Sequence, residues 1–326
     1  MTTEYPPCAS VKLRVLATTD LHMQVRGWDY TADRAAPGMG LARIASLIEA
    51  ARDEAPNSLV LDCGDHLQGN PMGDLFAGES GLHPMFAAMH AAGIEATTLG
   101  NHDFNYGLEA LENALETAPF PVLCANVVLT GDGALLVPAT TILERRVRDA
   151  EGAEQVLRIG LIGLCPPQIM MWDARHLSGR VEAGDMIDAA AAHVPALRAA
   201  GADIVIALSH SGIEPGPRQP LQEQASLHLA RVPGIDAIVA GHQHRLFPGP
   251  EFAAGDGIDH EAGTLHDVPT VMPGFWGTHL GVLDLDLVRD GNRWRIAGHE
   301  STLRPVADRT ADGSLRLLVP ESPAVL

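Results

Sequence analysis

The sequence predicts an α/β fold, because strand-like and helix-like segments alternate along most of its length. The strand-like segments are short and rich in β-branched residues, and they cover residues 11–19, 58–62, 94–99, 120–127, 157–164, 202–209 and 235–240. The helix-like segments carry apolar residues at helical spacing, and they cover residues 41–54, 83–93, 107–118 and 186–201. Pro195 lies inside the last of these and is expected to bend or shorten it. Such alternation is typical of parallel strands joined by crossover helices.

A second observation concerns the C-terminal part, where the helix-like segments stop. Residues 279–302 have the pattern of two strands with a hairpin turn around Asp290, Gly291 and Asn292. After Leu303 the periodic pattern is lost, as in a linker. The predicted organisation is an N-terminal tail at residues 1–10, one domain at 11–303, and a linker or trimmed tail at 304–326.

Composition limits the partners that the chain can bind. The 326 residues include 41 acidic and 22 basic side chains, which gives a formal net charge of −19. A field of this sign repels polyanions, so a nucleic-acid polymer is not expected as a partner, and a small anion needs a local positive charge. No apolar run is long enough to cross a bilayer, so a membrane is not expected as a partner either. The sequence leaves the oligomeric state open.

The N-terminus and the cysteines bear on the compartment. The first residues, MTTEYPPCAS, lack the basic start and apolar stretch of an export signal. We therefore expect a cytoplasmic protein from the chain as given, and a periplasmic one if a signal peptide has been removed. The cysteines show no CxxC pairing and are expected to be reduced and mostly buried; they are Cys8, Cys63, Cys124 and Cys165.

Polar side chains follow five of the predicted strands at the point where each strand ends. Because the carboxyl ends of parallel strands meet at one edge of a sheet, these side chains are expected to converge. Asp-x-His and His-x-His spacing also lets residues i and i+2 face the same side. Imidazole, carboxylate and amide groups suit two divalent ions that share a carboxylate, with Mn, Fe, Zn, Co or Ni as the candidates. The candidate ligands are Asp20, His22, Asp65, Asn101, His210, His242 and His244.

Each of these fragments, taken alone, has a simpler interpretation. A lone DLH or GNHD segment is most often a helix cap or a turn, and Asp62 and Asp103 are also candidates for turn caps. The histidines in helical segments are expected to be ordinary packing or surface residues; they are His83, His90, His193 and His228. The occurrence of seven nitrogen and oxygen ligands together, each at a strand end, favours a metal site over these interpretations.

The motifs D-x-H, GDxxQG, GNHD, an isolated histidine after an apolar strand, and GHxH follow one another over roughly residues 11–300. In this order they resemble the calcineurin-like metallophosphoesterase superfamily. The resemblance implies a four-layer α/β/β/α sandwich with a dinuclear metal site at the carboxyl ends of the strands. It also implies that Asp65 bridges the ions and that His102 lies beside the substrate, oriented by Asp103. The implied metal groups are Asp20, His22 and His244 for one ion, and Asn101, His210 and His242 for the other.

A narrower resemblance comes from the segments between the motifs. The stretches QGNPMGD, GNHDFNYGLE and CPPQIMMWDARHLSGRV are similar to the catalytic domain of the 2',3'-cyclic-nucleotide 2'-phosphodiesterase/3'-nucleotidase family. This resemblance implies hydrolysis of 2',3'-cyclic nucleotides and 3'-nucleotides by a metal-activated water, with assistance from His102. The chain departs from the family at Met23, Gln24 and His66, which follow predicted ligands.

Two other functions remain open at this stage. A 5'-nucleotidase, or a broad phosphomonoesterase or phosphodiesterase, would use the same ligands with a different leaving group. A metal-binding domain that is inactive without the family's C-terminal nucleotide-binding domain is the alternative of another class, because that domain is absent from the chain as given. The candidate aromatic residues for contact with a nucleobase are Phe247, Phe275 and Trp276.

Overall fold

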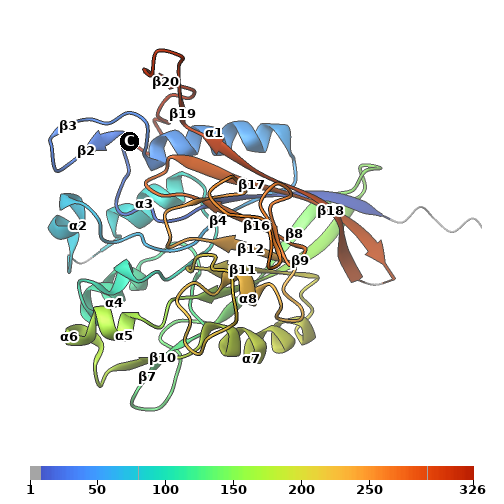
Figure 1. The fold of residues 1–326 in the computed structure, drawn as a ribbon, viewed down its shortest axis with the longest axis horizontal. Helices are drawn as coiled ribbons and strands as arrows, with labels where there is room; N and C mark the ends of the chain where they lie inside the picture. Colours follow the sequence, from blue (N-terminus) through green and yellow to red (C-terminus); the bar gives the residue numbers. More distant parts are fainter. Residues whose placement is uncertain (1–8, 80, 292) are drawn as a thin grey trace, which may run out of the picture.

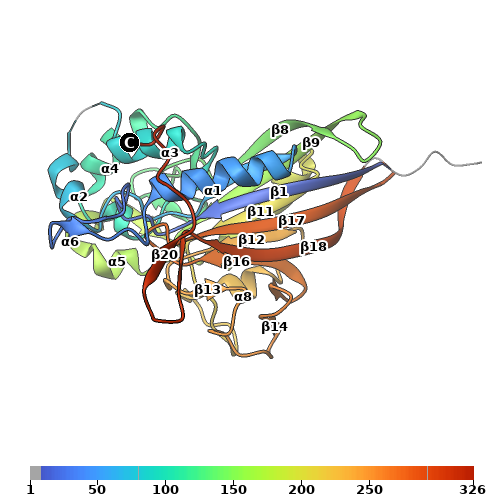
Figure 2. The ribbon, with the colours of Figure 1, turned by 90° about the horizontal axis from the view of Figure 1, so that it is seen from above.

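The computed structural model, which describes residues 9–79, 81–291 and 293–326, has two β-sheets stacked between two layers of helices (Figure 1; Figure 2). Helix α1 (Leu41–Glu54) covers one side of the sheets and α7 (Met186–Ala199) covers the other. The α/β/β/α sandwich that the resemblance implies is therefore confirmed. The predicted N-terminal tail falls mainly on residues 1–8, which lie outside the described residues.

The first sheet has the strand order β18-β17-β1-β4, in which β1 and β4 are parallel and the other neighbours are antiparallel. Its strands are β1 (Ser10–Thr18), β4 (Ser58–Asp62), β17 (His279–Asp290) and β18 (Arg293–Pro305). The β17–β18 pair confirms the predicted hairpin, although Asn292 in its turn lies outside the described residues.

The second sheet has the order β14-β15-β16-β12-β11-β9-β8, and β13 pairs with β16. Strands β9, β11, β12 and β16 run parallel to one another at its centre. Its strands are β8 (Thr140–Arg148), β9 (Glu154–Leu164), β11 (Ile204–Ser209), β12 (Ala237–Ala240), β13 (Leu246–Phe247), β14 (Ile258–Asp259), β15 (Thr264–Leu265) and β16 (Val268–Pro273).

The core divides into three apolar clusters because alternate strand residues face opposite sides of each sheet. Leu16 of β1 packs in the cluster that includes α1, whereas its neighbour Val15 packs between the two sheets. In the second sheet, Ile206 of β11 faces the space between the sheets and Val205 faces α7. All four side chains are at most 1% exposed, so both sheets are covered on both faces at these positions.

The remaining elements are short and lie mostly in the connections. The helices are α2 (Pro71–Phe76), α3 (Pro84–Ala91), η1 (His102–Phe104), α4 (Leu108–Glu116), α5 (Ile169–Trp172), α6 (Ala174–Leu177) and α8 (Ser226–Leu229). The strand pairs are β2 (Trp28–Asp29) with β3 (Arg34–Ala35), β5 (Thr97–Thr98) with β6 (Val122–Leu123), β7 (Val127–Leu129) with β10 (Val181–Ala183), and β19 (Ala307–Arg309) with β20 (Leu315–Leu317).

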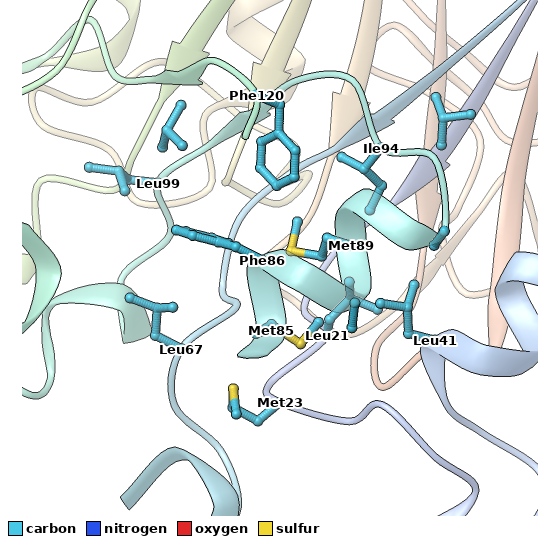
Figure 3. Close-up of a cluster of buried hydrophobic side chains, with 14 of the residues drawn as sticks. Leu21, Met23, Leu41, Leu67, Met85, Phe86, Met89, Ile94, Leu99 and Phe120 are labelled. Atoms are coloured by element: carbon cyan, nitrogen blue, oxygen red, sulfur yellow. The ribbon is translucent and has the colours of Figure 1, made fainter. Parts of the chain in front are cut away.

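The loop after β1 is fixed by apolar residues that alternate with its polar ones. Leu21 and Met23 are 0% exposed and join a cluster with Leu41 of α1 and Phe86 of α3 (Figure 3). The intervening His22 points away from this cluster toward the other sheet's loops, since its ring nitrogen Nε2 lies 3.0 Å from that of His244. The unusual Met23 is thus a core residue that anchors the loop.

The structure corrects two predictions about strands and one of the two effects predicted for Pro195. Only Thr97–Thr98 of the predicted strand 94–99 is a strand, and the run 120–127 divides between β6 and β7. Pro195 does not shorten its helix, because α7 continues to Ala199. The apolar face of α7 is buried on both sides of the proline, which offsets the lost hydrogen bond.

Residues 304–326, predicted as a linker or tail, are folded against the domain. The predicted boundary at Leu303 falls inside β18, and the side chain of Val306 is 0% exposed. Arg43 of α1 donates to the Val319 carbonyl at 2.6 Å, and the Ser322 N–H donates to the Ala42 carbonyl at 2.8 Å. This segment therefore belongs to the same packed unit as α1.

Two further findings bear on the composition-based expectations. Cys63, Cys124 and Cys165 are buried free thiols, as predicted, and Cys8 lies outside the described residues. Within the described part of the chain, no helix has both the length and the apolar character needed to cross a bilayer.

Candidate metal centre

The loops that follow β1, β4, β5, β11 and β12 meet at one edge of the two sheets and bring the predicted ligands together. The side-chain ligand atoms form two groups of three residues, and within each group they lie within 4.8 Å of one another. The first group is Asp20, His22 and His244; the second is Asp65, His210 and His242. The first group has the three residues that the resemblance implies for one ion, and the second has His210 and His242 together with Asp65, which the resemblance implies as the bridge.

The first group has its nitrogen and oxygen atoms turned toward a common point. His244 Nε2 lies 3.0 Å from His22 Nε2 and 3.2 Å from Asp20 Oδ1. The other ring nitrogen of His22, Nδ1, lies 2.8 Å from the Gln68 carbonyl, which fixes the ring with Nε2 facing inward. Such a backbone partner is the usual way to orient a metal-binding imidazole.

The second group is built in the same manner around His210. His210 Nδ1 lies 2.6 Å from the Cys63 carbonyl, and its Nε2 lies 3.1 Å from Asp65 Oδ2 and 3.2 Å from Asn101 Oδ1. The amide oxygen of Asn101, a predicted ligand, therefore lies beside this group. His242 Nε2 has a further partner in this structure, Glu223 Oε1 at 2.8 Å, which the sequence did not indicate.

Two aspartates connect the groups. Asp65 Oδ2 lies 3.1 Å from His210 Nε2 and 3.8 Å from His22 Nε2, so it faces both groups at once. Asp20 Oδ1 lies 3.2 Å from His244 Nε2 and 3.9 Å from His210 Nε2. A carboxylate between two groups of imidazoles is what two neighbouring cations require for charge balance.

The residues present fit a pair of divalent ions. Asp20 Oδ1 is buried and accepts no well-aligned hydrogen bond in the described part of the chain, although buried polar atoms normally have a partner. The three donor types, neutral imidazole, carboxylate and amide oxygen, match borderline divalent metals. The site therefore has both the geometry and an unsatisfied oxygen that a cation would satisfy.

Comparison with known proteins agrees with this geometry. The sequence matches the family described as Calcineurin-like phosphoesterase over residues 13–246, a range that includes all the ligands named above. The chain belongs to this family. Proteins of the family use divalent metals, which accounts for the two groups of ligands in this phosphoesterase.

Two of the similar proteins carry the name of a nucleotide phosphoesterase. The chain is 44% identical over 311 residues to a 2',3'-cyclic-nucleotide 2'-phosphodiesterase/3'-nucleotidase of Salmonella typhimurium, covering 94% of this chain and 48% of that relative. A relative of the same name from Haemophilus influenzae is 40% identical, with 98% of this chain and 49% of the relative covered. The chain thus spans about half the length of these relatives.

A solved structure and a more distant relative complete the comparison. The crystal structure of the calcineurin-like phosphoesterase YfkN from Bacillus subtilis superimposes with a TM-score of 0.87 at 40% identity, with 91% of each chain covered. A 5'-nucleotidase of Mus musculus is 27% identical over 303 residues, covering 89% of this chain and 49% of the relative. The similarity is therefore greater to the cyclic-nucleotide enzymes than to this 5'-nucleotidase.

The backbone of this phosphoesterase adopts left-handed conformations at five of the ligands. The φ angles are 51° at Asp20, 49° at His22, 63° at Asp65, 71° at His242 and 57° at His244. Such conformations cost about 1–3 kcal/mol for each non-glycine residue and persist only where the surroundings enforce them. Here the loops are tied to one another by backbone hydrogen bonds, including Asp20 N–H to the Gly64 carbonyl and His22 N–H to the Asp65 carbonyl, each at 2.9 Å.

The electrostatics of the centre favour deprotonated carboxylates. Burial raises the pKa of Asp20 and of Asp65, but His210 and the other nearby imidazoles outweigh it and hold both pKa values below their ordinary range. Burial lowers the pKa of His22, so this ring is neutral at pH 7. Burial also acts against a charge on His210, but Asp65 and Asp20 outweigh it and raise its pKa to about 9. Binding of a cation at His210 therefore releases a proton and weakens as the pH falls.

His102 is held by a different residue from the one predicted. His102 Nδ1 lies 2.7 Å from Asn105 Oδ1, whereas Asp103 accepts the backbone N–H groups of His66, at 2.8 Å, and of Gly100, at 2.8 Å. The prediction that Asp103 orients His102 is wrong. Residues 102–104 form a 3₁₀ turn, in which side chains at i and i+3 lie on one face, so position 105 and not position 103 faces His102.

Asp103 instead stabilises the loop that carries Asp65. It accepts the N–H of Asp65 at 3.2 Å, and its Oδ2 lies 3.1 Å from His66 Nδ1. His66 Nε2 lies 2.7 Å from Asp62 Oδ1, which makes a fully buried carboxylate–imidazole–carboxylate cluster. Burial opposes a charge on His66, but Asp103 and Asp62 outweigh it and raise its pKa well above the usual value. The departure at His66 thus has a structural role beneath the centre.

The aromatic residues near the centre differ in part from those that the sequence indicated. Phe275 stacks on His244 with ring centroids 4.6 Å apart and an interplanar angle of 12°. Trp172, which the sequence analysis did not single out, lies 5.7 Å from His242 between ring centroids and is 44% exposed. Phe247 is 0% exposed and belongs to the core of the second sheet, so it is not available to a ligand.

Gly100→Ala is expected to disrupt the centre through one methyl group. A Cβ at position 100 would lie 2.2 Å from Asp65 Oδ1 and 2.5 Å from its backbone nitrogen. We expect a loss of about 1–3 kcal/mol in the free energy of unfolding, together with weaker metal binding. Urea unfolding and metal analysis measure both effects. Gly131→Ala is the control, because a Cβ there meets nothing within 4 Å, and an equal response of the two variants would refute the packing argument.

Proposed function

We propose that this phosphoesterase hydrolyses 2',3'-cyclic nucleotides and 3'-nucleotides with two divalent cations drawn from Mn, Fe, Zn, Co and Ni. The observation that supports the proposal most directly is the joining of two ligand groups by Asp65, in a chain 44% identical to a relative with that named activity. When bound, such cations supply positive charge for the phosphoryl oxygens and activate water. The substrate is a small phosphoester, since the net charge of −19 opposes binding of a polyanion.

The chain's own contribution to catalysis is assigned to His102. Its backbone N–H donates to Asp65 Oδ1 at 2.7 Å, and its ring lies edge-on to His22 with centroids 5.0 Å apart. His102 therefore contacts the first ligand group through its ring and Asp65 of the second group through its backbone. With Nδ1–H engaged by Asn105, a ring protonated at both nitrogens presents Nε2–H, which can give a proton to the departing ribose oxygen or a hydrogen bond to the phosphate.

Two aromatic groups beside the centre, the exposed Trp172 and the partly buried Phe275, support a nucleoside substrate over inorganic polyphosphate. Trp172 and Phe275 each contact a different ligand histidine, His242 and His244. Aromatic faces of this kind bind bases and sugars by stacking and apolar contact. We expect only weak saturation by nucleotides if these two contacts alone hold the nucleoside.

A substrate panel tests the proposal. The chain loaded with Mn²⁺ is incubated separately with 2',3'-cyclic AMP, 3'-AMP and 5'-AMP, and the products are separated chromatographically. We expect conversion of the first two, with 5'-AMP spared by at least about tenfold, because in-line attack requires the scissile phosphate to be placed relative to the ribose. The Asn101→Ala variant is the background control, since it lacks one ligand.

The panel also contains the results that would overturn the proposal. Conversion of 5'-AMP alone would assign the chain to the 5'-nucleotidases. Absence of turnover with two bound metals, including on bis(p-nitrophenyl) phosphate, would show that the chain is a metal-binding domain without activity of its own.

A further inference from the structure

Asp173 is a buried carboxylate close to the centre that the ligand set does not use. Its residue is 5% exposed, and among the ion pairs of the described residues none involves it. The contacts of its carboxylate are with the side chain of Asn105, whose Nδ2 lies 3.1 Å from Oδ1 and 3.0 Å from Oδ2. A buried carboxylate paired only with an amide is costly, so its position is informative.

The contact fixes the orientation of the Asn105 amide. A carboxylate can only accept hydrogen bonds, so the NH₂ group of Asn105 must face Asp173 and its carbonyl oxygen must face His102. The carbonyl oxygen can only accept in turn. His102 must therefore carry a proton on Nδ1, and Nε2, which faces away from this Asp173–Asn105–His102 relay, carries a second proton only when the ring is cationic.

Without Asp173, neither the orientation of the Asn105 amide nor the position of the proton on the His102 ring would be fixed. The amide of Asn105 can rotate by half a turn and present NH₂ in place of the oxygen to His102 Nδ1, which favours the opposite tautomer. A carboxylate at the end of the chain of hydrogen bonds excludes that rotation. Asp103 cannot perform this task, because its oxygens are occupied by backbone N–H groups beneath the metal loop.

We propose that Asp173 is a positioning residue for His102, which acts through Asn105 to set the tautomer and the direction of the imidazole. Asp173 lies at the junction of α5 and α6, 68 residues beyond Asn105. The adjacent Trp172 contacts His242 of the metal centre. The segment 169–173 thereby contacts both the Asn105 that holds His102 and, through Trp172, the metal-centre residue His242. The kinetic part of this proposal depends on the function proposed above; the tautomer part does not.

Asp173→Asn tests the relay with an isosteric change. With two facing amides both orientations of Asn105 become possible, so the Nδ1–H form of His102 should lose its dominance. Long-range ¹H–¹⁵N spectra of the imidazoles in the metal-free protein report the tautomer, with the signal of His102 assigned by its loss in His102→Asn. We expect kcat to fall by about ten- to a hundredfold while KM and metal content change less than twofold.

The double variant N105D/D173N exchanges the two groups and should restore the relay. The carboxylate then accepts directly from His102 Nδ1 and from the amide at position 173, whereas N105D alone places two carboxylates face to face. We expect recovery of at least half of the lost kcat and return of the Nδ1–H signal. Asp188→Asn, at an exposed side chain of α7, is the control, because it makes the same aspartate-to-asparagine change away from the relay.

Three results would overturn the proposal. The first is an unchanged tautomer signal in Asp173→Asn, because the carboxylate would then serve only to anchor the loop. The second is a loss of activity in the double variant as great as in the single ones. The third is a normal kcat in Asn105→Ala, which removes the middle residue of the same relay. Asn105→Ala also serves as the test if Asp173→Asn does not fold. If no substrate is turned over by the parent chain, the tautomer measurement alone decides, so failure of the proposed function is distinguishable from failure of the relay.

Discussion

Asp65→Asn is expected to abolish turnover and to release both metal ions. The Asp65 carboxylate lies between the two ligand groups, with Oδ2 3.1 Å from His210 Nε2 and 3.8 Å from His22 Nε2. An asparagine retains the shape and removes the negative charge that two cations would share. Loss of a partner that only orients a ligand lowers metal affinity by 10- to 100-fold, so loss of the shared ligand should lower it by at least about a hundredfold.

The same substitution also removes an anchor of His102. Asp65 Oδ1 accepts the backbone N–H of His102 at 2.7 Å, and an amide side chain can present either oxygen or NH₂ there. The substitution is therefore expected to affect both metal binding and His102, the residue proposed to act on the substrate. A loss of kcat/KM of about a thousandfold or more is expected, because the electrostatic contribution of the centre is removed.

Metal content by mass spectrometry after gel filtration and Mn²⁺ titration by calorimetry measure the first effect. Asp188→Asn again provides the control, since its side chain is 72% exposed and lies on α7. Retention of two ions per chain by Asp65→Asn would mean that Asp65 is not the bridging ligand. In that case Asp20, whose Oδ1 lies 3.9 Å from the Nε2 atoms of both His22 and His210, would be the next residue to test.

The ligands could be predicted from the sequence because each lies within a few residues of a strand end. The strands are recognisable by their β-branched pattern, and parallel strands place their ends at one edge, so position along the chain translates into position in space. In the sequence, the polar Asp20 and His22 alternate with the apolar Leu21. The structure shows that this alternation separates the two sides of the loop, because Leu21 is 0% exposed.

The residues that orient His102 could not be predicted in this way. Asp103 is the nearest carboxylate in sequence, but a 3₁₀ turn places Asn105 on the face of His102, and a turn of three residues leaves no periodic pattern. Asp173 comes from a connection far along the chain, and only the packing of α5 against the loops brings it to Asn105. Contacts between loops depend on tertiary structure, which local sequence does not encode.

The folded C-terminal segment was missed for a related reason. Residues 304–326 have no apolar periodicity, and their attachment to α1 uses backbone groups, such as the Val319 carbonyl that accepts from Arg43. Hydrogen bonds to the backbone are available to nearly any sequence, so composition cannot identify them. Buried Val306 and Val325 are isolated apolar residues, which only the structure shows to complete the cluster around α1.

His102→Asn is expected to lower kcat by about a hundredfold or more while both metals remain bound, because general acid catalysis contributes 10²- to 10⁴-fold. The side chain of His102 belongs to neither ligand group, and its backbone N–H, which survives the substitution, is what contacts Asp65. His90→Asn on α3 is the matched control, since His90 is exposed and lies away from the centre.

The dependence on leaving group then separates two roles for His102. If the imidazole donates a proton to the departing oxygen, the variant should lose far more activity on 3'-AMP, whose ribose oxygen is a poor leaving group, than on bis(p-nitrophenyl) phosphate, whose phenolate leaves unaided. If the imidazole only stabilises charge on the phosphoryl oxygens, both substrates should lose activity equally. Nε2 faces away from the Asn105 contact, so when the ring is protonated at both nitrogens the Nε2 proton is free to move to the departing oxygen, and we expect the unequal loss. Activity within twofold of the parent chain on both substrates would remove His102 from the mechanism.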